Sequence, residues 1–127
     1  MNANNSSVSE KTRYSDAELS EFKAIVEKKL RRAKDQFDYI HNQMKDLADN
    51  PDAKIRGLDD ATGVREVEQL NSAAARLQKH VQHLENALIR IDNKVYGICR
   101  MTGKLISKQR LKAVPHATLC IEAKQSR

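Results

Sequence analysis

Hydrophobic residues recur every three or four positions along two stretches of this 127-residue chain. The first stretch steps by 3, 4, 4, 3, 4, 3, 4 and 3 residues, which is a heptad seam with one stutter near Val26. The second stretch alternates steps of 3 and 4 without a fault. We therefore predict two long amphipathic helices. The first seam consists of Leu19, Phe22, Val26, Leu30, Ala33, Phe37, Ile40, Met44 and Leu47, and the second of Val67, Leu70, Ala74, Leu77, Val81, Leu84, Leu88, Ile91 and Val95.

The start of the first helix carries two recognisable signals. Ser15 and Glu18 have the spacing of a capping box, in which each side chain accepts a hydrogen bond from the other's backbone N–H. Tyr14 and Leu19 stand at the two positions of a hydrophobic staple. We predict that the helix begins at Asp16. Residues 1–14, which open with an Asn- and Ser-rich run, are expected to be a disordered lead-in.

The segment between the two seams, residues 50–63, contains Pro51 and Gly57 and breaks the helix. Helices of this length with one apolar stripe need a partner that covers the stripe. An antiparallel coiled-coil hairpin over residues 15–95, with its tip at 50–63, supplies that partner within one monomer. The alternative is a coiled-coil dimerisation or scaffold module, in which two copies share their seams. Either way the fold class is mainly α.

Residues 96–127 have a different pattern and predict a small knob. Apolar residues alternate around a turn at Gly103, which predicts a short β-hairpin, and a closing helix is expected between Ala117 and Lys124, after Pro115.

Charge divides the chain unevenly. Residues 94–127 hold eight Lys and Arg against one Glu, whereas residues 46–68 hold seven acids against three bases. The basic knob suits phosphates or an acidic protein surface. The acidic tip suits a cation or basic protein groups, although Asp is also common in turns and helix caps. The sequence lacks nucleophile-elbow, P-loop and HExxH motifs, so we do not expect an enzyme.

The cysteines Cys99 and Cys120 raise the question of a metal. Thr102 and Ala123 follow them at the spacing of zinc knuckles, so each knuckle lacks one ligand. His116 could supply a third ligand and Met101 a poor fourth, and we expect no cofactor, with zinc on Cys99 and Cys120 as the minority alternative. The chain has no apolar run long enough for a membrane span or signal peptide, which indicates the cytoplasm, where both cysteines stay reduced. Simple packing and a thiol redox sensor are the other two interpretations of the pair.

Several stretches together resemble the zinc-finger segment of the DksA/TraR family. They are ALIRI at 87–91, YGIC at 96–99, TGKLI at 102–106 and PHATLCIEA at 115–123. The resemblance implies a bacterial transcription regulator that binds core RNA polymerase and needs no specific DNA site. It also implies that the hairpin tip enters the secondary channel of the polymerase. The residues that this assigns are Asp59, Asp60 and Ala61 at the tip, Cys99, Thr102, Cys120 and Ala123 at the degenerate ligand positions, and Arg110, Lys112 and Lys124 as basic contacts.

The chain also departs from the family pattern. The tip motif Asp-x-x-Asp-x-Ala falls on Arg56, Asp59 and Ala61, so its first Asp is replaced, with Asp60 as partial compensation. The positions of the basic residues that respond to ppGpp fall on Val114, His83 and Lys124, of which only Lys124 is a Lys or Arg. The resemblance therefore implies at most a weak response to ppGpp.

Overall fold

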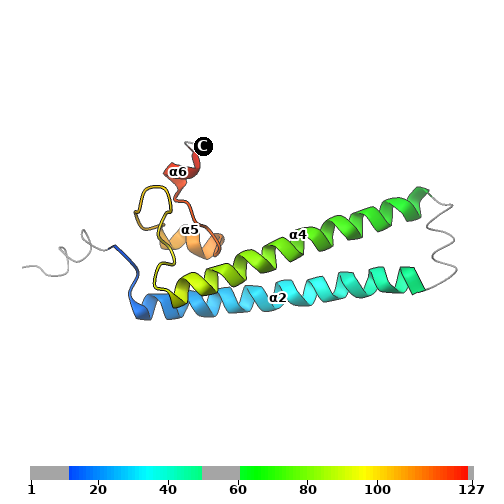
Figure 1. Ribbon diagram of the computed structural model, residues 1–127, viewed down its shortest axis with the longest axis horizontal. Helices are drawn as coiled ribbons and strands as arrows, with labels where there is room; N and C mark the ends of the chain where they lie inside the picture. Colours follow the sequence, from blue (N-terminus) through cyan, green and yellow to red (C-terminus); the bar gives the residue numbers. More distant parts are fainter. Residues whose placement is uncertain (1–11, 50–60, 126–127) are drawn as a thin grey trace, which may run out of the picture. The chain divides into compact units, whose positions relative to one another are not determined.

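The computed structural model describes residues 12–49 and 61–125, and the side chains of the second range from residue 64. In these ranges the chain forms helices α2 (Asp16–Asp49), α4 (Ala61–Asp92), α5 (Lys108–Ala113) and α6 (Ile121–Gln125) (Figure 1). The mainly α fold class is confirmed. Across the same residues, none of the helices has the length and apolar character needed to cross a bilayer.

The capping box forms as predicted, and α2 begins at Asp16. The Ser15 N–H donates to Glu18 Oε1 at 2.9 Å, and the Glu18 N–H donates to Ser15 Oγ at 3.1 Å. Both staple residues are buried, Tyr14 to 4% exposure and Leu19 to 2%. Tyr14 had been the last residue of the expected lead-in. It belongs instead to the packed core, because its ring has hydrophobic partners in the knob.

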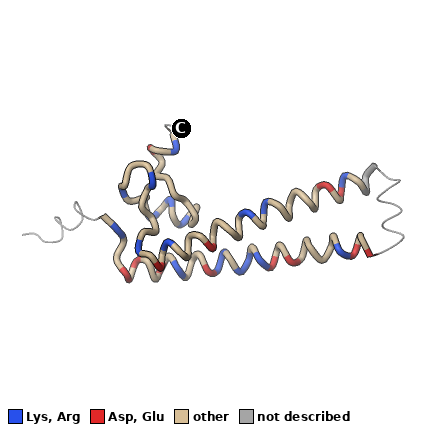
Figure 2. The backbone as a smooth tube through the Cα atoms, in the orientation of Figure 1, with Lys and Arg blue, Asp and Glu red and all other residues tan. Residues whose placement is uncertain are grey.

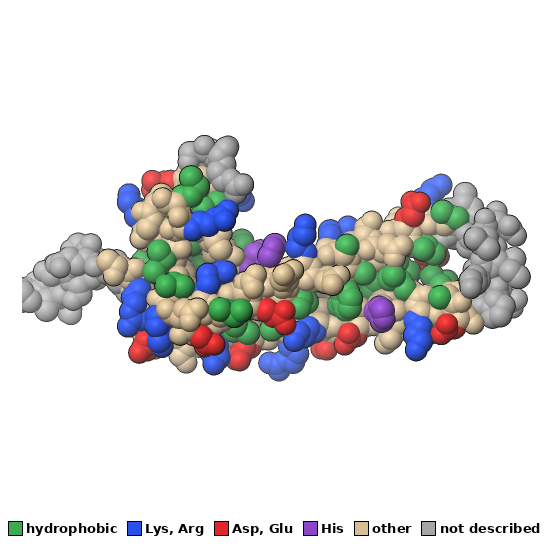
Figure 3. Space-filling view, in the orientation of Figure 1, with side chains coloured by type: hydrophobic (Ala, Val, Ile, Leu, Met, Phe, Trp, Pro, Cys, Tyr) green, Lys and Arg blue, Asp and Glu red, His purple; other side chains and the backbone are tan. Residues whose placement is uncertain are grey.

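The chain forms two compact units. The first unit combines the residues up to Lys28 with those from Leu84 onward, and the second unit spans Lys29–His83. In the second unit, α2 and α4 run antiparallel and side by side (Figure 1). Hydrophobic side chains are visible between them in Figure 3.

The two units bury their seams to different degrees. Beyond Ala33, the seam residues of the second unit are half-buried on both helices, because two helices alone cover only one side of each apolar stripe. In the first unit, Val26, Leu84 and Ala87 are fully buried. The difference arises because the knob adds a further layer over the helices there. We expect the first unit to contribute most of the hydrophobic stabilisation.

Helix α4 ends earlier than the seam predicted. The Val95 N–H donates to Arg90 O and the Lys94 N–H to Ile91 O, both at 3.0 Å, which is the hydrogen-bond pattern of a Schellman motif. Lys94 occupies the left-handed position of the motif, with φ 64°. The prediction that Val95 lies in the seam was wrong, because the motif turns the chain away and leaves its side chain 46% exposed.

The knob contains less β-structure than predicted and one more helix. Its chain reversal has a single antiparallel bridge, between Ile98 and Leu105, among the described residues. The ladder does not extend because Gly97 and Gly103 have positive φ close to both sides of the bridge. Helix α5, capped by Ser107, had not been predicted, and the closing helix α6 begins at Ile121, later than expected.

Candidate functional site

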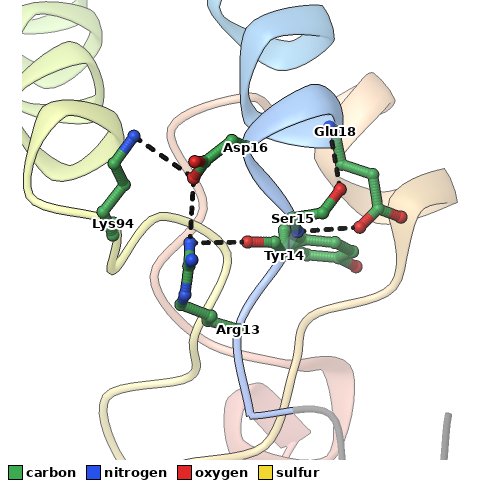
Figure 4. A network of polar contacts seen from close by, with 6 residues as sticks. All are labelled: Arg13, Tyr14, Ser15, Asp16, Glu18 and Lys94. Atoms are coloured by element: carbon green, nitrogen blue, oxygen red, sulfur yellow. Dashed lines mark hydrogen bonds and ion pairs between the residues drawn. The ribbon is translucent and has the colours of Figure 1, made fainter. Parts of the chain in front are cut away.

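Polar contacts tie the residues around the start of α2 to Lys94, just after α4, as Figure 4 shows. Asp16 pairs with Arg13 at 3.2 Å and with Lys94 at 3.3 Å, and hydrogen bonds from Arg13 and then Lys94 lower the pKa of its carboxyl. Glu18 pairs with Lys108 of α5 at 2.6 Å. The two Asp16 pairs are largely exposed and contribute little stability, whereas the Glu18 side chain is only 17% exposed. These pairs fix the position of residues 13–18 relative to Lys94 and Lys108.

A cluster of aromatic rings lies beneath these contacts. The ring of Phe22 contacts Tyr14 at 5.4 Å and Tyr96 at 5.3 Å between centroids. The Tyr14 hydroxyl donates to the carbonyl of Ile106 in the knob. Burial raises the pKa of both Tyr14 and Tyr96. Their hydroxyls therefore remain protonated donors at neutral pH. The Tyr14 hydroxyl joins the residues before α2 to the knob, and the Tyr96 hydroxyl bonds to Pro115 O within the knob.

The loop that carries Cys120 is held through its backbone carbonyls. Tyr96 Oη donates to Pro115 O at 2.8 Å, an Arg90 guanidinium N–H to His116 O at 3.4 Å, and Arg110 Nε to Leu119 O at 2.9 Å. Hydrogen bonds to three of its carbonyls fix the backbone conformation of this loop. Three elements therefore position Cys120 in the knob.

Cys99 is the other cysteine of the knob. Its side chain is 1% exposed. Burial raises the pKa of the thiol, but hydrogen bonds from the Thr102 hydroxyl and from the backbone N–H groups of Cys120, Thr102 and Met101 lower it to about 6. Hydrogen bonds to a charged group favour the charged form. The thiolate form of Cys99 is therefore favoured more than in an ordinary cysteine.

The Thr102 hydroxyl joins the two cysteines. Its oxygen accepts a hydrogen bond from the Lys104 N–H at 3.2 Å and lies 3.8 Å from Cys120 Sγ. Either atom can be the donor in the Thr102–Cys120 contact. Both sulfurs thus share one hydroxyl, at the positions where a knuckle would place a metal.

Comparisons with known proteins place this geometry in a family. Residues 94–127 match a family model described as the prokaryotic dksA/traR C4-type zinc finger. The chain is 31% identical over 110 residues to the RNA polymerase-binding transcription factor DksA of Salmonella typhimurium, covering 86% of this chain and 70% of that protein. The chain belongs to the DksA/TraR family.

Other DksA proteins agree with this assignment. DksA of Caulobacter vibrioides is 29% identical over 114 residues, which are 87% of this chain and 75% of that one. The solved structure of transcription factor DksA2 from Pseudomonas aeruginosa matches with a TM-score of 0.75 at 26% identity, covering 87% of this chain and 82% of that chain. The relatives are named as transcription factors and not as enzymes.

The C4-type zinc finger of the DksA family does not fit the residues present in this chain. A structural zinc ion needs four ligands, and Thr102 and Ala123 occupy two of the four positions. The Ala123 methyl group, which is buried, has no lone pair to offer. Within residues 12–49 and 61–125, no three His, Cys, Asp or Glu side chains gather as metal ligands would.

The other residues assigned from the DksA family resemblance are spread over the chain. Asp59 and Asp60 lie outside the described residues, and Ala61 is the first residue of α4. Arg110 is half-buried and uses its Nε within the knob, whereas Lys112 and Lys124 are exposed. Figure 2 shows Lys and Arg residues along the turn, α5 and α6 of the knob.

Sequence reasoning missed the residues that hold this site together. Tyr14, Tyr96 and Arg90 make their decisive contacts with partners far away in the sequence, and nothing in their local spacing indicates those partners. The cap of α5 was detectable, because Ser107 is followed by helix-forming residues and its Oγ accepts from the Arg110 N–H at 3.2 Å.

The ionisation of Cys99 can be tested directly. We expect its thiolate absorbance to titrate near pH 6, below its ordinary pKa of 9.0, and Thr102→Val to raise that pKa by removing a donor. Because the pKa is lower in the folded chain, the stabilising contribution is full above pH 9 and is lost as the pH falls through about 6. Unfolding of the wild type and of Cys99→Ser, compared from pH 9 to pH 5, measures this loss. A titration unchanged by Thr102→Val would contradict the assignment.

Proposed function

We propose that this chain binds core RNA polymerase as a monomer and modulates transcription initiation, with the turn between α2 and α4 entering the secondary channel. The observation that carries the proposal is its similarity, over most of the chain, to DksA proteins named for binding RNA polymerase. The two-helix hairpin matched by the DksA2 structure supports the same conclusion. The chain would act in the bacterial cytoplasm and would not recognise a DNA sequence.

Asp59, Asp60 and Ala61 are the residues that we assign to the polymerase interior. Two adjacent carboxylates in a narrow channel act through their charge and position on the metal ions or basic groups of the partner. No bond is made or broken by this chain. The exposed Lys112 and Lys124 would contact acidic protein at the channel rim, where steering by complementary charge mainly accelerates association. With Val114 and His83 at two of the family's basic positions, a response to ppGpp is expected to be weak.

The tip assignment is tested with Asp59→Asn combined with Asp60→Asn. These isosteric changes remove two charges, so we expect run-off transcription to lose most of its response to the protein while binding to core polymerase falls much less. The matched control is Asp35→Asn with Asp38→Asn, because both are exposed acids on α2. If the two double variants change transcription equally, the tip assignment is wrong.

A coiled-coil dimerisation module remains the competing function, and the half-buried seam of the second unit is the observation in its favour. Sedimentation separates the two. The proposed function expects a 14.4 kDa monomer. A dimer that persists at low concentration, with no affinity for core polymerase, would support the dimerisation module instead.

A further inference from the structure

The degenerate knuckles keep two sulfurs together although they cannot complete a zinc site. Cys99 Sγ accepts hydrogen bonds from the Thr102 hydroxyl and the Cys120 backbone N–H, and Cys120 Sγ lies 3.8 Å from the same hydroxyl. Nothing in the proposed polymerase function uses these groups. The site therefore consists of two cysteines that both contact the Thr102 hydroxyl, from chain positions 21 residues apart.

The number and type of ligands decide which metal such a site suits. Zinc prefers four ligands in a tetrahedron. Soft thiolates select Cu(I), and a closed-shell monovalent ion of this kind is satisfied by two sulfurs in a nearly linear arrangement. Thus the loss of the ligands at Thr102 and Ala123 excludes a closed zinc site without excluding a two-coordinate one.

We propose that Cys99 and Cys120 form a two-coordinate site for a soft monovalent cation, with Cu(I) as the physiological candidate. On binding, each coordinating sulfur forms one bond to the metal and releases to solvent any proton that it carries. The metal keeps its oxidation state, so neither an oxidant nor a reductant is consumed.

The surroundings of the two sulfurs stabilise the negative charge of the Cu(I) complex. A complex of one monovalent cation with two thiolates carries a single negative charge. The backbone N–H groups of Met101, Thr102 and Cys120 point toward Cys99, and donors of this kind stabilise anionic sulfur. The excess of Lys and Arg over Glu in residues 94–127 favours the same charge.

Burial also suits an ion that is easily oxidised. Cys99 is shielded from solvent, whereas Cys120 is half-buried. The half-buried sulfur gives an incoming ion a first point of attachment, from which it can pass to the shielded one. Exchange of Cu(I) from a small-molecule carrier therefore needs no large opening of the knob.

The test is an anaerobic titration of the full chain with Cu(I) held by a competing chelator such as bathocuproine disulfonate. We expect one Cu(I) per monomer, an X-ray absorption spectrum with two sulfur ligands, and no stable complex with Zn(II). Cys99→Ser and Cys120→Ser should each weaken binding about 100-fold, since even outer-shell partners of a metal are worth roughly 10- to 100-fold. The control Met101→Leu, which removes the neighbouring exposed thioether, should leave binding unchanged.

Three outcomes would overturn the proposal. They are binding that survives in either serine variant, one Cu(I) shared between two chains in a dimer, and tighter binding of Zn(II) than of Cu(I). A gain-of-ligand variant gives an independent check, because Thr102→Cys with Ala123→Cys restores four thiols and should shift the preference to Zn(II). Retained run-off activity in the serine variants would show that the metal site and the polymerase function are separate.

Discussion

Replacing Gly97 by alanine is expected to destabilise the protein by about 2–4 kcal/mol, from a strained left-handed backbone and an overpacked core. Gly97 has φ +80°, and a Cβ there would lie 2.7 Å from Tyr14 Cε2 and 3.1 Å from Leu111 Cδ1. The Tyr14 ring cannot retreat, because its hydroxyl is bonded to Ile106 O and its ring packs on Phe22. Urea unfolding of the variant measures the loss.

Gly103 provides a matched control in the knob, also at a positive φ. Its φ is +73°, but a Cβ there would meet nothing within 4 Å. Gly103→Ala should therefore cost only the backbone strain, about 1 kcal/mol. Equal losses in the two variants would show that the close approach of Tyr14 to the backbone contributes nothing.

Replacing Phe22 by alanine is expected to cost about 3–5 kcal/mol, the usual range for a large buried side chain whose removal leaves a cavity. Phe22 is 3% exposed and joins Tyr14 to Tyr96. Its loss removes two ring contacts and loosens the attachment of the knob to α2. Such a cost is a large part of the total stability of a small domain, roughly 5–15 kcal/mol.

Phe37 is the comparison for Phe22, because both are phenylalanines on α2 and both lie in the first seam. Phe37 is half-buried and stacks on His41 at 5.9 Å. Phe37→Ala should cost about 1–2 kcal/mol, in proportion to the smaller apolar area that it covers. Denaturant unfolding followed by near-ultraviolet circular dichroism checks both variants. A loss at Phe37 as large as that at Phe22 would contradict the difference in burial between the two units.

The sequence pattern was sufficient for the parts of the fold that depend on local chemistry. The heptad spacing located both helices, and the residues of both seams are buried or half-buried except Val95. The capping box placed the first residue of α2 correctly, because Ser15 and Glu18 satisfy each other's backbone groups within one turn. These predictions succeeded because each depends on neighbours a few residues away.

The failures share the opposite property. Lys94 adopts a conformation typical of glycine, and its side chain pairs with Asp16, at the far end of the chain from it. Tyr14 bonds to a carbonyl 92 residues away. Such partners are visible only once the fold is known.

The site was partly predictable. Its residues Cys99, Thr102, Cys120 and Ala123 followed from the knuckle spacing. The role of Thr102 did not follow, because a threonine at a ligand position indicates a lost ligand and not a hydroxyl that contacts both cysteines. Arg110, assigned from the resemblance as a basic contact, also holds the loop that carries Cys120 through its Nε.

The composition of the first unit affects how the chain folds during synthesis. Residues 14–28 leave the ribosome well before residues 84–123 are translated, and the first unit needs both segments. The second unit can close earlier, because its two helices are joined by a short link. Until the knob emerges, Leu19, Phe22 and Val26 lack the layer of side chains that it adds over the helices. A truncated chain therefore presents an exposed apolar surface of the kind that chaperones and proteases bind, which ties survival in the cell to completion of the knob.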